Sequence, residues 1–253
     1  MSSIGTGYDL SASQFSPDGR VFQVDYAGKA VEKSGTVIGL RGKDGVVLAV
    51  EKIVTSPLLE ENAGARLYTV DRNIGLALAG LLADGRYIVD IARQEATSYR
   101  QQFDRTIPLK ILNERISAYI HAYTLYSAVR PFGVTVILAS WDEEGGPQLY
   151  KIEPSGSSFG YFGCASGKAK QQAKTEIEKL TLGDMTTEEL VKNAGKIIYQ
   201  VHDELKDKDF KLELSVVCKE LNGLHRTAPE PWYEMAIESG RAAKKEDDSD
   251  NEI

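Results

Sequence analysis

Two periodicities of hydrophobic residues follow one another along the chain and divide it into blocks. Apolar residues spaced three and four apart predict helices in residues 20–33, 89–103, 109–123, 168–180 and 186–205. Short apolar runs bounded by turn residues predict strands in residues 36–41, 45–50, 66–70, 74–79, 134–139, 148–152, 159–163 and 212–218. After the first helix, the order is strands, two helices, strands, two helices and a strand. Segregated blocks of this kind favour an α+β domain with two stacked sheets between helix pairs over alternating β-α-β units.

Two short motifs mark where elements begin. Asp44-Gly45 lies between two apolar runs, which is typical of the turn of a β-hairpin. Thr186 is followed three residues later by Glu189, which is the pattern of a helix capping box. The sequence therefore predicts a hairpin near residue 44 and a helix that starts at Thr186.

The two ends of the chain differ from the part between them. Residues 1–19 are polar and rich in Gly and Ser, and a reverse turn is predicted at residues 16–19. Residues 20–228 carry the periodic pattern of the domain. The C-terminal segment, residues 229–253, is predicted to form a surface helix and then a charged, disordered tail from residue 244.

Composition narrows the class of protein. The 253 residues are 42% hydrophobic and 26% charged, which is an ordinary globular balance. No apolar run approaches the ~20 residues that span a bilayer, and the N-terminus lacks the pattern of a signal peptide. We therefore expect no membrane association and a location in the cytoplasm and nucleus.

Charge and cysteine content argue against two further kinds of site. The net charge is −7 without a concentrated basic stripe, which argues against nucleic-acid binding. Cys164 and Cys218 belong to no CxxC pair and no zinc-ligand pattern, so we expect buried, reduced thiols. The sequence predicts neither a metal site nor a cofactor.

Three segments resemble one family. Tyr8, Asp9 and residues 15–27 closely resemble the N-terminal signature of proteasome alpha subunits, with Asp25 where the family usually has Glu. Residues 123–134 and 163–176 resemble later parts of the same family. Together these matches span most of residues 8–218.

Finer features point to one type among the alpha subunits. Most alpha subunits have Arg directly after the residue that matches Asp9, whereas this chain has Leu10. Many have Gln at the position of Leu125. The long acidic tail is similar to that of the same type.

The resemblance implies an architecture and an assembly. The fold would be a four-layer αββα sandwich of the N-terminal-nucleophile hydrolase type. The chain would join six other proteasome alpha subunits in a hetero-heptameric ring, which stacks on a beta ring.

The resemblance also implies that this chain has no catalytic residue. In related beta subunits, the nucleophile is an N-terminal threonine whose own amino group is the base. When residues 45–49 are aligned with the matching beta strand, Gly35 falls at the nucleophile position and Thr36 one place late. Glu51 then holds the place of the catalytic Asp, and Arg66 falls at or next to that of the catalytic Lys. Thirty-four residues precede Gly35, so a free amine is absent there.

Residues of the N-terminal tail are expected to act as a gate. In the family, a cluster matching Tyr8, Asp9, Pro17 and Tyr26 holds the tails in an open arrangement around an axial pore. Because Leu10 replaces the usual Arg, we expect this chain to contribute less to that arrangement than its neighbours.

Two further positions are candidate interaction or modification sites. The family lysine that pairs with the terminal carboxylate of a regulatory particle's peptide matches Arg66. Ser249 lies in an acidic context suited to phosphorylation by an acidophilic kinase.

Two other functions stay open at this point. An active threonine peptidase subunit would require processing that exposes a threonine, and Thr36 is more simply an ordinary strand residue. A free-standing binding or nucleic-acid-processing protein is disfavoured by the low basic content.

Overall fold

The structure is a computed structural model that describes residues 7–60, 62–204 and 209–251, with only the backbone described for residues 246–251. Its elements follow the chain as α1 (Phe22–Glu32), β1 (Val37–Arg41), β2 (Gly45–Ile53), β3 (Leu67–Asp71), β4 (Ile74–Gly80), α2 (Leu82–Phe103), α3 (Leu109–Ala122), β5 (Val134–Asp142), β6 (Gly146–Ile152), β7 (Ser158–Gly160), β8 (Gly163–Ser166), α4 (Lys170–Glu178), a 3-10 turn (Leu182–Asp184), α5 (Thr187–Val201), β9 (Phe210–Cys218), β10 (Arg226–Thr227) and α6 (Glu230–Asn251).

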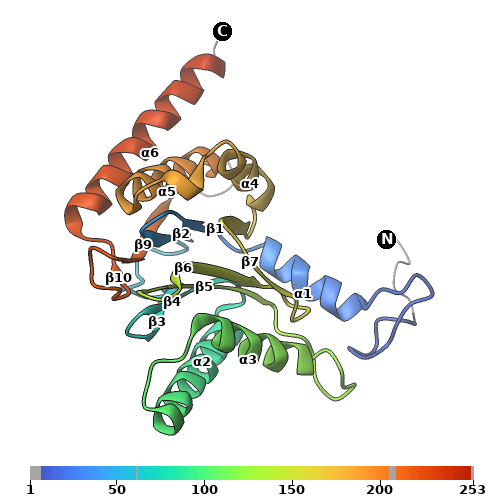
Figure 1. Cartoon of the computed structure of the whole chain (residues 1–253). Coiled ribbons are helices and arrows are strands. Elements are labelled where there is room, and N and C mark those ends of the chain that lie inside the picture. The colour runs from blue at the N-terminus through green and yellow to red at the C-terminus, as the bar shows by residue number, and fades with distance from the viewer. Residues whose placement is uncertain (1–6, 61, 205–208, 252–253) are drawn as a thin grey trace.

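Two antiparallel sheets form the centre of the molecule. One has the strand order β10-β9-β2-β1-β8 and the other β3-β4-β5-β6-β7. Figure 1 shows the two sheets face to face, with α4 and α5 covering one outer face and α2 and α3 the other, while α6 packs on α5. Helix α1 lies at one end of the sandwich, next to the N-terminal segment. The predicted layered α+β arrangement is confirmed.

Strand β2 shows how the sequence produces three hydrophobic layers. Val46, Leu48 and Val50 belong to the cluster between the two sheets. Val47 and Ala49, which alternate with them, belong to the cluster under α4 and α5. Since successive side chains of a strand point to opposite faces, a strand buried on both faces reads as an unbroken apolar run. A third cluster lies between the other sheet and α2 and α3.

Helices α5 and α6 cross at close range. A Cβ atom at Gly195 would lie 2.2 Å from the backbone oxygen of Ala236, and one at Gly240 would lie 2.4 Å from the ring of Tyr199. Only glycine fits these two positions, so the backbones of the helices approach closely. The capping box at the start of α5 is confirmed, because the Thr186 side chain accepts a hydrogen bond from the Glu189 N–H and the Glu189 carboxylate accepts one from the Thr186 N–H.

The structure differs from the sequence prediction at several boundaries, and α2 begins at Leu82, seven residues before its predicted start. The segment predicted as one strand at 159–163 is two strands, β7 and β8, which belong to different sheets. The chain changes sheet between them, where Tyr161 N–H donates to the Leu149 carbonyl and Arg41 N–H donates to the Phe162 carbonyl. Helix α5 ends at Val201, earlier than predicted.

The C-terminal segment is a further difference. Disorder is predicted from residue 244, but α6 continues to Asn251. Residues 241–245 are Arg, Ala, Ala, Lys and Lys, which all favour helix. Lys244 also forms an ion pair with Glu204, which ties this part of α6 to the end of α5.

A buried histidine makes stability depend on pH. His225 is 8% exposed, its Nδ1 lies 2.8 Å from Thr69 Oγ1, and its Nε2 has no hydrogen-bond partner in the part of the chain that the structure describes. Burial lowers the pKa of His225 from 6.5 to about 4. Between these values the unfolded chain binds a proton that the folded chain does not, so stability falls as pH falls. We expect His225 to lower the free energy of unfolding by up to about 3 kcal/mol across this range.

Urea titrations at neutral and acid pH measure this effect. The slope of stability against pH should be shallower in His225→Gln than in the wild type. Equal slopes in the two proteins would show that His225 does not titrate in this way.

Candidate functional site

The predicted remnant of an active site lies where β1 begins and β2 ends, beside a cavity of about 700 Å³. Gly35, Arg66 and Lys168 all line this cavity. Among the described residues, the other basic side chains in its wall are Lys33, Lys52 and Lys211, and the acidic one is Glu60. The cavity is therefore lined by more cationic than anionic side chains.

At the predicted nucleophile position, the backbone leaves no room for a side chain. A Cβ atom at Gly35 would lie 2.1 Å from the backbone oxygen of Glu51. The next residue, Thr36, is fully buried, and its hydroxyl has no hydrogen-bond partner among the described residues. Thr36 lies inside a continuous chain, so its nitrogen is a peptide N–H and not an amine.

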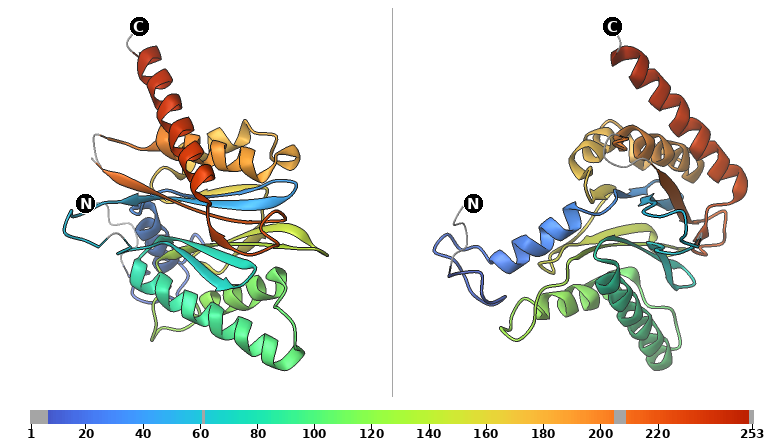
Figure 2. Two further views of the ribbon diagram at one scale, coloured as in Figure 1. Left: turned by 90° about the vertical axis from the view of Figure 1, so that its left-hand side faces the viewer. Right: turned by 180° about the vertical axis from the view of Figure 1, so that it is seen from behind.

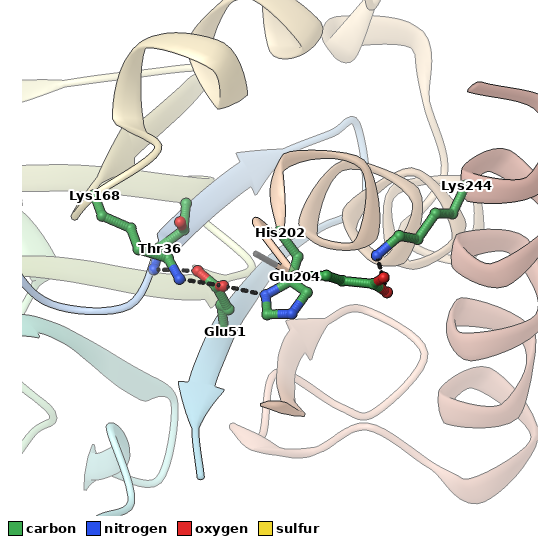
Figure 3. A network of polar contacts seen from close by, with 6 residues as sticks. All are labelled: Thr36, Glu51, Lys168, His202, Glu204 and Lys244. Carbon is green, nitrogen blue, oxygen red and sulfur yellow. Dashed lines mark hydrogen bonds and ion pairs between the residues drawn. The ribbon is translucent and has the colours of Figure 1, made fainter. Parts of the chain in front are cut away.

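Both carboxylate oxygens of Glu51 contact other groups of the chain (Figure 3). One carboxylate oxygen, Oε2, accepts the Thr36 N–H at 2.9 Å. The other, Oε1, lies 2.8 Å from Lys168 Nζ and 2.6 Å from His202 Nδ1. The side chain of Glu51 is fully buried, and the ring of His202 packs on Phe210 with 4.3 Å between ring centroids. We name Glu51, Lys168 and His202 the Glu51 cluster.

Sequence reasoning missed two of the three residues of this cluster. Lys168 follows directly after Gly167, inside a segment that resembles the family, but no local pattern links it to Glu51. His202 comes 151 residues after Glu51. The alignment with the beta strand places Arg66 near the catalytic lysine position, whereas the lysine that contacts Glu51 in the described chain is Lys168.

Arg66 is held in the cavity wall just before β3. Its backbone N–H donates to Glu213 Oε2 and its Nη1 donates to the Gly80 carbonyl, both at 2.9 Å. Burial is the main cause that lowers the pKa of the guanidinium, partly offset by the charge of Glu213. Glu213 also pairs with Lys52 Nζ at 3.3 Å. The guanidinium of Arg66 is thus held by a neutral carbonyl, and Glu213 is shared between the Arg66 backbone and Lys52. The positive charge of Arg66 stays in the cavity wall.

Of the predicted gate residues, Asp9 and Tyr26 contact each other through a hydrogen bond, and the other two do not take part in it. Tyr26 of α1 donates its hydroxyl to Asp9 Oδ2 at 3.0 Å, and Gln23 Nε2 donates to the Asp9 carbonyl. Pro17 lies in a turn closed by the Gly19 N–H on the Ser16 carbonyl at 2.9 Å. Tyr8 is 41% exposed and has no polar or ring contact with these residues in the described chain.

The remaining candidates give little chemistry. Cys164 and Cys218 are free and buried, as predicted, and burial raises the pKa of Cys164 to about 12. Ser249 lies on the backbone of α6, but its side chain is outside the described residues. Within the described ranges, no group of three or more His, Cys, Asp or Glu residues could hold a metal ion. Nor does any helix there have the length and apolarity to cross a membrane.

Comparison with known proteins identifies the class. Residues 31–217 match the family model for proteasome subunits, and residues 8–30 match the model for the N-terminal signature of the A-type proteasome subunits. The chain therefore belongs to the proteasome alpha-subunit family, whose members form hetero-oligomeric rings in the 20S particle and are generally non-catalytic.

The most informative relatives have one type in common. The chain is 69% identical over 252 residues to the type-3 alpha subunit of the Drosophila melanogaster proteasome, with 100% of this chain and 99% of the relative covered. It is 57% identical to the type-3 subunit of Acanthamoeba castellanii, with 99% of each chain covered. It is 52% identical to that of Arabidopsis thaliana, with 99% and 100% covered. The type indicated by Leu10, Leu125 and the acidic tail is type 3, and this prediction is confirmed.

Proposed function

We propose that this chain is a non-catalytic structural and gating subunit of the outer ring of the 20S proteasome. In this role it controls substrate access and docks regulatory particles during ATP- and ubiquitin-dependent, and also independent, protein degradation. One observation carries the non-catalytic part of the proposal: Gly35 stands at the nucleophile position against the Glu51 backbone, with no room for a hydroxyl-bearing side chain. The chain continues through this position, so the required amine is missing as well.

The proposed assembly follows from the family. The partners are six other alpha subunits, the beta ring and regulatory particles, with no nucleic acid and no membrane. The two-sheet sandwich supports a relation to N-terminal-nucleophile hydrolases, and the proposed location is the cytoplasm and nucleus. The intact mass of the subunit, measured together with the size of its assembly, tests this. An unprocessed subunit in a ring-sized particle is expected, whereas a stable monomer or a chain cleaved before Thr36 would contradict it.

The proposed gate is the segment before Pro17. The hydrogen bond from Tyr26 to Asp9 and the turn at residues 16–19 support this role, because they fix one end of the segment to α1. Deletion of residues 2–12 should raise the basal peptide hydrolysis of assembled particles, since a plug would be removed from the pore. Tyr26→Phe removes only the hydroxyl that donates to Asp9, so it tests whether this hydrogen bond anchors the segment. Unchanged hydrolysis after the deletion would count against gating by this subunit.

Arg66 is the proposed receptor for the carboxylate of a docked peptide. Its place in the wall of a cation-rich cavity supports this role, and arginine matches the geometry of a carboxylate. Arg66→Ala particles should bind an activator at this subunit on the order of tenfold more weakly. Arg86→Ala, which removes an exposed arginine of α2, serves as the control. Full binding and full activation of the Arg66→Ala particle would remove the assignment.

Ser249 is the proposed phosphorylation site. The acidic residues around it support recognition by an acidophilic kinase, and a phosphate would deepen the negative charge of the segment. Mass spectrometry that finds Ser249 unmodified under all conditions would end this proposal.

A further inference from the structure

We infer that Lys168 is a second anchor for the carboxylate of a docked peptide, and that Glu51 positions it. This inference rests on the proposed docking function of the cavity that Arg66 lines. It assigns a new role to the remnant of the active site: the carboxylate at the catalytic Asp position holds a lysine that binds a ligand.

The two cations reach the cavity from different sheets. Arg66 directly precedes β3 in one sheet, and Lys168 follows β8 in the other. Both residues line the same cavity of about 700 Å³, together with Gly35 from the segment before β1. A carboxylate has two oxygen atoms and accepts several hydrogen bonds. An anion bound in this cavity can therefore be contacted by one cation from each sheet.

Lys168 is held in position before any ligand arrives. Its Nζ lies 2.8 Å from Glu51 Oε1, and its side chain is 21% exposed, so it is fixed and also open to the cavity. Glu51 in turn accepts hydrogen bonds from the Thr36 N–H and His202. A lysine fixed in this way loses little rotamer freedom when it binds an anion. An ammonium donates up to three hydrogen bonds, so its pairing with Glu51 does not prevent contact with a second anion.

Other lysines of the cavity fit this role less well. Lys52 is only 12% exposed and pairs with Glu213. Lys33 is exposed at the rim, so its long side chain would lose more entropy on binding. Arg66 itself already donates Nη1 to the Gly80 carbonyl, which uses part of its donor capacity. Lys168 is therefore better placed than Lys33 or Lys52 to share the carboxylate with Arg66.

The experiment measures docking at this one position in the ring. Thr55 is exposed and lines the same cavity, so Thr55→Cys provides a site for disulfide cross-linking in assembled particles. The probe is the C-terminal octapeptide of a regulatory-particle protein, carrying one cysteine, as the free acid and as the C-terminal amide. Lys168→Met is compared with Lys170→Met. Lys170 is a matched control because it lies two residues later, pairs with Glu32 at 2.6 Å and lies outside the cavity wall.

The expected result depends on the carboxylate. Lys168→Met should weaken cross-linking of the acid peptide on the order of tenfold and leave that of the amide unchanged. Lys170→Met should behave like the wild type with both peptides. Glu51→Gln, which keeps Lys168 but weakens its support, should reduce the preference for the acid by a smaller factor. If Lys168→Met does not assemble, Lys168→Gln replaces it, since glutamine can still donate a hydrogen bond to Glu51.

Three results would overturn the inference. Lys168→Met could bind the acid peptide as well as the wild type does. It could weaken the acid and the amide equally, which would indicate a structural effect. In both cases, Arg66→Met is measured as well. If Arg66→Met no longer prefers the acid peptide over the amide, the docking function of the cavity stands and only the role of Lys168 is rejected. If the wild type does not distinguish acid from amide, the docking function itself fails, and the role of Lys168 fails with it.

Discussion

Replacement of Glu51 by alanine should lower the free energy of unfolding of the protein by about 3–5 kcal/mol. The carboxylate is fully buried, and three donors converge on it: the Thr36 N–H, Lys168 and His202. Removing it leaves the buried Thr36 N–H and the buried His202 ring without their acceptor, and it takes away the partner of the Lys168 ammonium. Urea titration of the subunit, or its abundance in assembled particles, measures the loss.

A second Lys–Glu pair in the same region provides the control. Glu32 pairs with Lys170 at 2.6 Å, and both side chains are about half exposed. Exposed pairs contribute less than about 1 kcal/mol, so Glu32→Ala should change stability little. In the double variant Glu51→Ala/Lys168→Met, part of the loss should be recovered, because the orphan charge is removed as well. Equal effects of Glu51→Ala and Glu32→Ala would show that the Glu51 cluster does not stabilise the fold.

Placing threonine at the position of the beta-subunit nucleophile, as Gly35→Thr, should yield neither a peptidase nor a stable subunit. The Cβ atom would lie 2.1 Å from the Glu51 backbone oxygen, so β1 or β2 has to shift. Overpacking against side chains typically costs about 1–3 kcal/mol, and a clash with backbone should exceed about 3 kcal/mol because the strand cannot rotate away. Incorporation into particles and peptide hydrolysis by the purified protein are the measurements.

Gly28→Thr is the matched substitution for this experiment. Gly28 lies on α1, and a Cβ atom there would meet nothing within 4 Å. It should leave the stability of the protein almost unchanged, since helix propensity differs only modestly between the two residues. A Gly35→Thr subunit that assembles normally and reacts with a threonine-directed inhibitor would contradict the proposed loss of catalysis.

Local patterns predicted most of the fold for identifiable reasons. The hairpin at Asp44-Gly45 and the capping box at Thr186 depend on neighbouring residues, so the sequence reveals them directly. The division between β7 and β8 depends on which sheet each segment joins, and periodicity carries no information about that. The extension of α6 depends on helix propensity and on an ion pair with Glu204, neither of which the charge of the segment reveals.

Only those residues of the site that can be aligned with related beta subunits were predictable from the sequence. Alignment of the strands with those of beta subunits predicts the places of Gly35, Glu51 and Arg66. Each of these residues lies on or next to a strand, so the alignment carries over to it without a gap. Lys168 and His202 reach Glu51 from distant parts of the chain, and only the folded chain shows that they meet. The same holds for Tyr8, which the resemblance grouped with Asp9 and Tyr26 but which has no such contact in the described chain.

The tight crossing of α5 and α6 has a consequence for the end of the chain. Figure 2 shows α6 extending past α4 and α5 into open space. The middle of this helix is fixed on α5, because Ala236 packs on Gly195 and Gly240 on Tyr199, and its last turns continue from there as a semi-rigid helical spacer. Residues 246–251 extend it by about 9 Å at 1.5 Å per residue. A binding partner would thus find these acidic residues at a nearly constant height above the surface, within a small search volume.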